Sequence, residues 1–257
     1  MKRLFLFTIL FFSLFVLTTH AQNTPKIIAH RGYWNCEGSA QNSIRSLEKA
    51  AEIGVYGSEF DVHLTADDVL VIYHDNEIDS MHIQSTPYAQ LKNCRLSNGE
   101  PLPTLESFLK RAQTLKNIRL IFELKAHATP ERNREAARRS LDMIRKYQLE
   151  DRTDYITFDL DAAKEFVACA PKGEVVYLNG ELSPKALKAM DFDGLDYNTK
   201  VYLAHPQWIS EAKQLGLSSN VWTIRTKEDA QTFIDMGIDY LTTDCPETVK
   251  ALIQGKE

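Results

Sequence analysis

The stretch Ser58–Leu64 reads SEFDVHL and alternates two kinds of side chain. Glu59, Asp61 and His63 occupy every second position, and apolar residues fill the positions between them. Because successive side chains of a β-strand point to opposite faces, one face here is apolar and the other carries two carboxylates and an imidazole. The polar face either looks at bulk water, as in many antiparallel strands, or looks into a shared interior site.

The rest of the chain favours the interior site, because short apolar runs alternate with amphipathic stretches along its length. We expect strands over residues 26–29, 56–64, 119–124, 154–158, 174–178, 194–198, 219–224 and 240–243. The expected helices span 42–53, 104–114, 131–147, 162–169, 183–190, 206–215, 227–236 and 246–253. A run at 69–73 adds a strand that pairs with the second one through the turn 65–68. The pattern predicts an α/β fold, a (β/α)8 TIM-type barrel with a β-hairpin extension after strand 2. A doubly wound open sheet is the alternative.

The N-terminal segment, residues 1–21, has the layout of a secretory signal peptide. Lys2 and Arg3 precede a nearly unbroken apolar run over residues 4–17, and a small-residue pattern ends at Ala21. The run is shorter than the roughly 20 residues of a membrane-spanning helix. We therefore expect cleavage after Ala21, export to the periplasm or the medium, and no membrane anchor after cleavage. An uncleaved N-terminal anchor is the alternative.

Residues 22–257 form one domain in this interpretation, because no Gly/Ser-rich linker or low-complexity tract divides them. They carry 28 basic and 35 acidic residues, and their net charge of −7 argues against binding to nucleic acid or to anionic lipid. The four cysteines form no C-x-x-C pair, which argues against a zinc site. We expect free thiols, and a Cys36–Cys94 disulfide is the alternative that export would permit.

Three acidic residues are expected to meet at the carboxyl ends of the barrel strands, where the sites of such barrels lie. Glu59 and Asp61 are on the second strand and Glu123 is on the third. Carboxylates in a confined space either acquire a raised pKa or bind a cation. Three oxygen ligands without a cysteine suit one hard divalent cation, Ca²⁺ or Mg²⁺. Surface ion pairs with Lys125 or Arg31 are the alternative.

Two histidines end strands on the same face of the expected barrel. His30 follows the first strand and His74 follows the hairpin strand, which makes them candidates for the general acid and the general base. Arg31 and Lys125 supply positive charge for a phosphate group. Trp222, on the seventh strand, is either a core residue or the apolar wall of a pocket.

The remaining histidines have simpler interpretations. His63 shares the face of the two acids on its strand but lies near the turn, so it is either an outer contact of the site or exposed. For His82, His127 and His205 we expect structural hydrogen bonds.

Seven short motifs resemble, in order, those of the glycerophosphodiester phosphodiesterase family. They are His30-Arg31-Gly32, Glu59-Phe60-Asp61-Val62, His74-Asp75, Pro103-Thr104-Leu105, Glu123-Leu124-Lys125, Trp222-Thr223 and Thr243-Asp244-Cys245-Pro246. The resemblance spans nearly the whole chain after residue 21 and implies a (β/α)8 barrel. It also implies metal binding by Glu59, Asp61 and Glu123, acid–base chemistry by His30 and His74, and phosphate contacts from Arg31 and Lys125.

The resemblance implies that the chain hydrolyses small-molecule glycerophosphodiesters to glycerol 3-phosphate and an alcohol. A second hypothesis keeps the same site but stops at a cyclic phosphate, as in phospholipase-D-like enzymes that act on lysophospholipids. A third hypothesis is a barrel that binds phosphodiesters or glycans without turnover. A two-metal amidohydrolase is disfavoured, because the first strand has no His-x-His motif.

Two departures from the family pattern concern the substrate. The family's Pro-Glu-Asn-Thr is replaced by Ala40-Gln41-Asn42-Ser43, so that an amide stands where a carboxylate is usual, near His30. In addition, only the segment 76–103 separates His74-Asp75 from Thr104. This segment is expected to be too short for the cap subdomain of some relatives, which predicts an open site and a bulky alcohol group.

Overall fold

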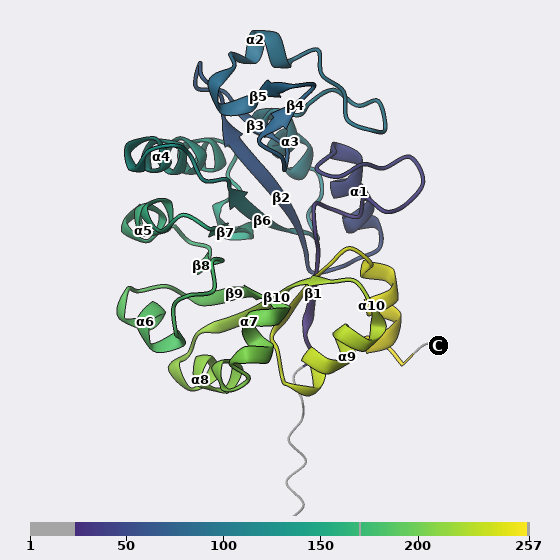
Figure 1. Ribbon diagram of the computed structural model, residues 1–257. Coiled ribbons are helices and arrows are strands. Elements are labelled where there is room, and N and C mark those ends of the chain that lie inside the picture. Colours follow the sequence, from purple (N-terminus) through teal and green to yellow (C-terminus); the bar gives the residue numbers. More distant parts are fainter. Residues whose placement is uncertain (1–23, 170, 256–257) are drawn as a thin grey trace, which may run out of the picture.

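Eight parallel strands close into a barrel surrounded by helices (Figure 1). The computed structural model describes residues 24–169 and 171–255. The barrel strands are β1 (Lys26–Ala29), β2 (Gly57–Leu64), β6 (Arg119–Leu124), β7 (Thr153–Thr157), β8 (Val175–Tyr177), β9 (Gly194–Asn198), β10 (Ser218–Ile224) and β11 (Tyr240–Thr243). β1 pairs with both β11 and β2, which closes the ring and confirms the (β/α)8 barrel. The expected signal peptide, residues 1–21, lies outside the described residues.

The helices follow the strands in the expected order. They are α1 (Ile44–Glu52), α3 (Leu105–Ala112), α4 (Pro130–Lys146), α5 (Leu160–Cys169), α6 (Pro184–Ala189), α7 (Thr199–Ala204), α8 (Gln207–Leu215), α9 (Lys227–Asp235) and α10 (Pro246–Ile253). Hydroxyl residues fix where several of them begin: Ser43, Thr104 and Thr129 each accept a hydrogen bond from a backbone N–H of the first turn. None of the helices in the described part of the chain is long and apolar enough to cross a membrane.

Two apolar layers stabilise the barrel, one outside the strands and one inside them. The outer layer lies between strands and helices, where Phe60 packs on Phe108 and Phe122 with ring centroids 4.5 and 5.7 Å apart. Burial of such a side chain contributes about 1.5–3 kcal/mol. The inner layer is smaller and consists of Ile28, Ile121, Ile156, Val176 and Leu178. Because the odd-numbered residues of β2 face inward, its acidic positions lie inside the ring.

A small lobe, residues 65–104, leaves the barrel through the expected hairpin. β3 (Leu70–Ile72) pairs antiparallel with β2, and the lobe continues with β4 (Glu77–Ile78), β5 (Met81–His82), a 3₁₀ turn (Ile83–Ser85) and α2 (Tyr88–Leu91). The lobe has its own buried cluster, which includes Val71, Ile78, Ile83, Leu91 and Leu96. In Figure 1 it lies at the top of the view, next to α1 and α3. The lobe borders one side of the barrel mouth, and the expectation of an open site stays a prediction.

All four cysteines are free thiols. Cys94 belongs to the buried cluster of the lobe, whereas the Cys36 thiol donates to the carbonyl of Tyr33 at 3.3 Å. The alternative Cys36–Cys94 disulfide is not formed.

Candidate active site

The end of β1 makes a sharp turn that places two predicted site residues. Arg31 and Gly32 both have positive φ values, +56° and +75°, and the backbone N–H of Arg31 donates to Oε2 of Glu59 at 2.6 Å. A Cβ atom at Gly32 would lie 2.3 Å from Oγ of Ser46, so only glycine allows α1 to pack this closely. The turn thereby directs His30 and Arg31 over the barrel mouth.

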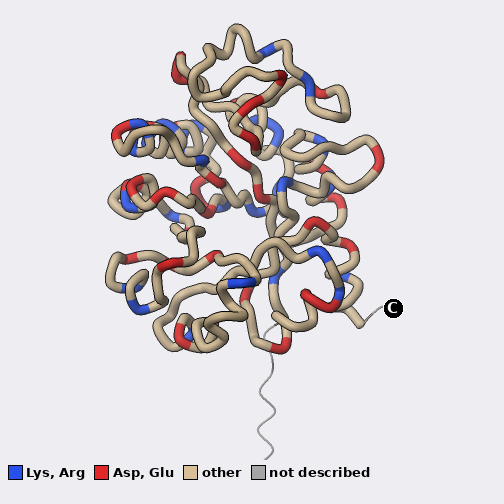
Figure 2. The backbone as a smooth tube through the Cα atoms, viewed as in Figure 1, with Lys and Arg blue, Asp and Glu red and all other residues tan. Residues whose placement is uncertain are grey.

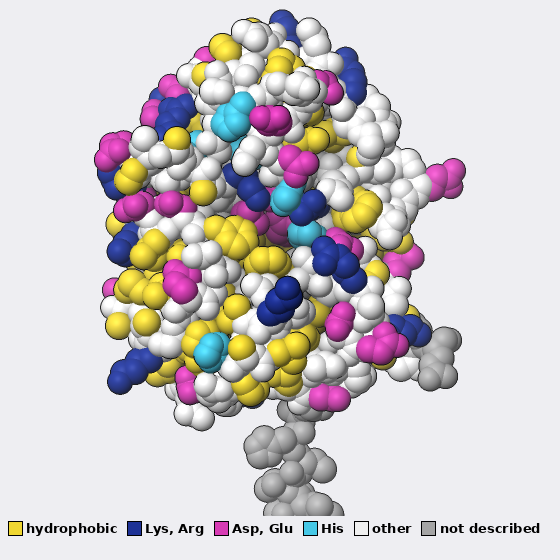
Figure 3. All heavy atoms as spheres, viewed as in Figure 1, with side chains coloured by type: hydrophobic (Ala, Val, Ile, Leu, Met, Phe, Trp, Pro, Cys, Tyr) yellow, Lys and Arg dark blue, Asp and Glu magenta, His cyan; other side chains and the backbone are white. Residues whose placement is uncertain are grey.

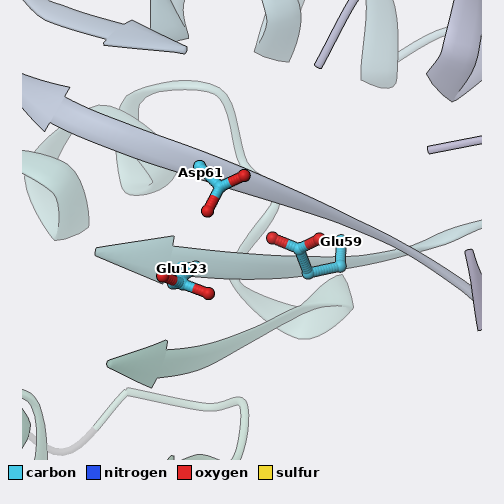
Figure 4. Close-up of side chains that lie close together, drawn as sticks. All are labelled: Glu59, Asp61 and Glu123. Carbon is cyan, nitrogen blue, oxygen red and sulfur yellow. The ribbon is translucent and has the colours of Figure 1, made fainter. Parts of the chain in front are cut away.

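The three predicted acids meet in the barrel. Glu59, Asp61 and Glu123 each offer one oxygen, and these oxygens lie within 4.8 Å of one another (Figure 4). β2 and β6 are neighbours in the register Asp61↔Glu123, which brings the carboxylates together. All three side chains are buried. In Figure 2 the outer helices carry both basic and acidic residues, and acidic residues also lie along the central strands.

Burial and mutual repulsion shift the pKa values of these acids apart. Burial, followed by the charge of Asp61, raises the pKa of Glu123 to about 7 and the pKa of Glu59 well above its ordinary value. Burial also raises the pKa of Asp61, but Lys125, His74, Asn42 and Arg31 together outweigh it, and the net pKa is lowered. In the absence of a cation, protons therefore neutralise part of the cluster.

The donor set fits a hard divalent cation. It consists of carboxylate oxygens alone, and Oε1 of Glu59 is buried without a hydrogen-bond partner. Asn42 fixes Asp61 from the other side: its amide donates to Oδ2 of Asp61 at 2.8 Å, and its oxygen accepts from the Asp61 backbone N–H at 3.0 Å. Cation binding would replace the protons that burial retains on Glu59 and Glu123.

Two basic side chains border the cluster. The ammonium of Lys125 donates to Glu123 at 2.8 Å and to Asp61 at 3.2 Å, and the guanidinium Nε of Arg31 lies 3.8 Å from Asp61. The predicted alternative of ion pairs with these residues is thus partly correct, but the pairs are inside the barrel mouth and not on the outer surface. Three carboxylates and two cations leave one negative charge when all are ionised. A divalent cation would make the group positive by one, which matches a phosphodiester monoanion.

Both predicted acid–base histidines are oriented by a carboxylate. Nδ1 of His30 lies 2.7 Å from Oδ1 of Asp244, and Nδ1 of His74 lies 2.6 Å from Oδ1 of Asp75. Since a carboxylate can only accept, each imidazole carries its Nδ1 proton toward that partner and leaves Nε2 for other contacts. Arg225 holds the other oxygen of Asp244 at 2.8 Å.

Two cavities border on His74. The smaller, about 160 Å³, is lined by seven of the eight predicted site residues: His30, Arg31, Glu59, His74, Glu123, Lys125 and Trp222. The larger, about 470 Å³, lies between the loop after β1 and the lobe and is lined by Trp34, Gln41, Tyr73, Asp75 and Ser97 among others. Figure 3 shows acidic side chains at the bottom of a central hollow, ringed by histidine and basic side chains. The structure brings the predicted residues together; their roles stay predictions.

One wall of the smaller cavity is apolar. The indole of Trp222 stands edge-on to Phe158 with ring centroids 5.5 Å apart, and its Nε1 donates to the carbonyl of Asp196 at 2.9 Å. Trp222 lines the cavity and also packs against the inner apolar layer, so each of the two interpretations describes part of its surroundings.

Asp196 is a residue that the sequence reasoning missed. It lines the same cavity and is buried, with Oδ1 unpartnered, and burial followed by the charge of Glu123 raises its pKa well above the ordinary value. An acid in the middle of the apolar strand GLDYN was the signal that could have indicated it.

His63 is neither exposed nor in contact with the carboxylates. Its side chain is completely buried beneath the lobe, and burial lowers its pKa to about 3. His127 is also buried, with a pKa lowered to about 4.

Several known proteins are similar to this chain over most of its length and have the same fold. Residues 30–248 match the model of the glycerophosphoryl diester phosphodiesterase family. A crystal structure of a glycerophosphodiester phosphodiesterase from Parabacteroides distasonis is 60% identical, with a TM-score of 0.90 over 91% of this chain and 99% of that one. A phosphodiesterase from Oleispira antarctica, solved with the product sn-glycerol-3-phosphate, is 24% identical and superposes with a TM-score of 0.78 over 90% and 97% of the two chains.

Among curated proteins, the glycerophosphodiester phosphodiesterase of Caldanaerobacter subterraneus subsp. tengcongensis is 25% identical over 89% of this chain and 97% of its own length. These similarities agree with the seven motifs and with the barrel. The chain belongs to the glycerophosphoryl diester phosphodiesterase family and is a phosphoric diester hydrolase.

Proposed function

We propose that the protein is an exported, divalent-cation-dependent phosphodiesterase that hydrolyses glycerophosphodiesters to glycerol 3-phosphate and an alcohol. The observation that carries this proposal is the convergence of two carboxylate-oriented histidines, two basic side chains and three buried acids on one cavity. The product complex of the Oleispira protein supports the same substrate class. Export rests on the signal-like residues 1–21.

Glu59, Asp61 and Glu123 would hold the cation, Ca²⁺ or Mg²⁺, which when bound supplies positive charge to the phosphoryl oxygens. Arg31 and Lys125 bind the same oxygens from the rim of the cavity and stabilise the charge that develops on them. The two basic residues act as fixed charges, since the ion pairs described above hold both side chains before substrate arrives.

His30 and His74 move the protons. In the first step the neighbouring hydroxyl of the glycerol attacks phosphorus and gives its proton to Nε2 of one imidazole. The bond from phosphorus to the alcohol oxygen breaks, and the other imidazole donates its proton to that oxygen. Water then opens the cyclic phosphate with the two roles reversed, which yields glycerol 3-phosphate. Each proton transfer contributes about 10²–10⁴ in rate.

The larger cavity is the natural position for the alcohol group. Its wall shares His74 with the smaller cavity, so a diester whose phosphorus lies beside His74 can extend one arm into each. The volumes of about 470 and 160 Å³ favour the bulkier arm in the larger cavity.

A second candidate function is favoured by one observation. The apolar wall of Phe158, Leu178 and Trp222 suits a lysophospholipid chain, and a cyclising enzyme would stop after the first step. A barrel that only binds its ligand, the third hypothesis, would show no turnover at all.

Phosphorus NMR of the products separates these functions. The substrates are glycerophosphocholine, glycerophosphoethanolamine, glycerophosphoinositol and a lysophospholipid, each with Ca²⁺ or Mg²⁺. We expect glycerol 3-phosphate with at least one metal and none after chelation with EDTA. A stable cyclic product would establish the lyase, and unchanged turnover in His30→Ala would disprove the proposed mechanism.

A further inference from the structure

Two buried histidines beside the site have fixed and opposite tautomers. Nδ1 of His63 lies 3.0 Å from Nε2 of Gln84, and that same amide nitrogen donates to the carbonyl of Ala126 at 2.9 Å. Since an amide nitrogen only donates, Nδ1 of His63 is the acceptor, and the proton of this imidazole is on Nε2. The carbonyl partner of Gln84 also fixes the orientation of the amide, because the amide oxygen in that place would face another acceptor, the carbonyl oxygen of Ala126.

His127 shows the reverse arrangement. The backbone N–H of Leu64 donates to Nε2 of His127 at 3.0 Å, so the proton of His127 is on Nδ1. Its own backbone N–H donates to Oδ1 of Asn133 at 2.7 Å, which ties the loop to the first turn of α4.

The backbone of a site residue lies near each of these imidazoles. The polar group beside His63 is the backbone of His74, and the one beside His127 is the backbone of Lys125. Neither contact has the geometry of a normal hydrogen bond, since Nε2 of His63 and Nδ1 of His127 both lack such a partner. A backbone hydrogen bond ties the clamp region to the segment after His74: the N–H of Ile83, next to Gln84, donates to the carbonyl of Asn76 at 2.9 Å.

Hydrogen bonds hold the segment 125–127 at three successive residues. The N–H of Lys125 donates to the carbonyl of Val62 at 3.0 Å, the carbonyl of Ala126 accepts from Gln84, and the ring of His127 accepts from Leu64. A segment fixed at each residue gives the Lys125 side chain one starting direction, toward the carboxylates of Asp61 and Glu123.

We infer that His63, Gln84 and His127 form a hydrogen-bonded clamp that positions His74 and Lys125 for the reaction. These three are positioning residues, because none of them contacts the two cavities. Gln84 belongs to the lobe and His127 to the loop after β6, so the clamp also fixes the lobe against the barrel mouth. The inference rests on the proposed function for its kinetic test and on geometry alone for its spectroscopic test.

The kinetic test compares variants of the clamp with a matched histidine outside it. His63→Leu removes both the acceptor and the donor, whereas His63→Gln offers one of each and should restore the contacts. We expect kcat of His63→Leu to fall about 10- to 100-fold, with KM changed less than about twofold, because displacement of an aligned group by about 1 Å costs that much. His63→Gln should stay within about threefold of the native kcat.

Gln84→Met is a second variant on a half-buried position, and it retains the shape of the side chain while removing the donor. It should lower kcat in the same way as His63→Leu. His82→Leu is the control, since His82 is exposed on the same lobe and its imidazole faces Ser85 and not the clamp. Its kcat should be native. Native kcat per folded molecule in both His63→Leu and Gln84→Met would overturn the clamp, as would equal losses in His63→Leu and His63→Gln.

The spectroscopic test does not require turnover. Nitrogen-15 NMR of the imidazoles should show the proton of His63 on Nε2 and the proton of His127 on Nδ1. The resonances of His74 should shift in His63→Leu and stay unchanged in His82→Leu. Reversed tautomers, or a His74 signal indifferent to His63, would overturn the clamp even if the protein hydrolysed no glycerophosphodiester.

Discussion

The guanidinium of Arg31 donates a hydrogen bond from Nη1 to the amide oxygen of Gln41 at 2.7 Å. The resemblance to the family leads one to expect a carboxylate at this position, which would form an ion pair with Arg31. An amide oxygen accepts the same hydrogen bond without neutralising the charge. Gln41 thus leaves the charge of Arg31 uncompensated on the side of the larger cavity, whereas Asp61 lies on its other side.

Gln41→Glu should therefore weaken substrate binding. A carboxylate within hydrogen-bond distance of the guanidinium would compete with the phosphate and add one negative charge to the larger cavity, so we expect KM to rise about three- to tenfold, with kcat less affected. Steady-state kinetics checks this, with Gln41→Met as the control that removes the hydrogen bond without adding charge. A lower KM in Gln41→Glu would contradict the interpretation.

Cation binding should release protons. Because the pKa of Glu123 is about 7 and that of Glu59 is raised well above its ordinary value, the cation-free cluster retains protons at a pH where exposed carboxyl groups have lost theirs. A cation requires all three acids ionised, so its affinity should increase as the pH rises from 6 to 8. Calorimetric titration of Mg²⁺ or Ca²⁺ in buffers of different ionisation enthalpy measures the release. Glu59→Gln should release fewer protons and bind more weakly; pH-independent binding would argue against this site.

A bulky side chain in the larger cavity should slow the hydrolysis of substrates with a large alcohol group more than that of substrates with a small one. Ser97 lies on its wall, and Ser97→Trp should lower kcat/KM at least tenfold for glycerophosphoinositol. The methyl ester of glycerol 3-phosphate, whose alcohol is small, should be turned over within about twofold of the native rate. The exposed Ser210→Trp, on α8, controls for the added indole. Equal losses for both substrates would place the alcohol elsewhere.

His127 should make the protein less stable in acid. Its folded pKa of about 4 lies below the ordinary value of about 6.5, so between these values the unfolded chain binds a proton that the folded state does not. The contribution is complete above pH 6.5 and is lost as the pH falls toward 4, by at most about 1.4 kcal/mol per pH unit. His63 acts in the same direction.

Denaturant unfolding of the native protein and of His127→Gln between pH 4 and 7 measures this contribution. The amide can still accept from the Leu64 N–H but cannot take up a proton, so the free energy of unfolding of the variant should fall less steeply with decreasing pH. Identical slopes for the native protein and His127→Gln would show that the folded state does not hold His127 in its neutral form.

Much of the fold follows from local sequence patterns. The alternation in SEFDVHL and RLIFEL predicts which face is inward, and the register of β2 and β6 then brings Asp61 opposite Glu123. His30 and His74 each follow a strand, and this position likewise predicts that both lie at the barrel mouth. These features depend on periods of two residues and on the chain order of strands, both of which are readable from one sequence.

The rest depends on contacts between distant segments. β4 and β5 have two residues each and are held by the lobe's buried cluster, so no local period marks them. The helix α7, with six residues, is also too short to show a clear period. The burial of His63 is decided by the lobe that covers it, and its partner Gln84 lies 21 residues further along the chain. No pattern within one strand could indicate that neighbour.

The way in which the lobe is connected allows it to change in length without a change in the barrel. Residues 65–104 begin after the last residue of β2 and end before the first residue of α3, and they contact the ring through the antiparallel edge of β3 and through Gln84. Insertions or deletions within this excursion leave the hydrogen-bond ladders among the eight parallel strands in place. Selection or engineering can thus change one rim of the active site while the eight-stranded barrel beneath it stays the same.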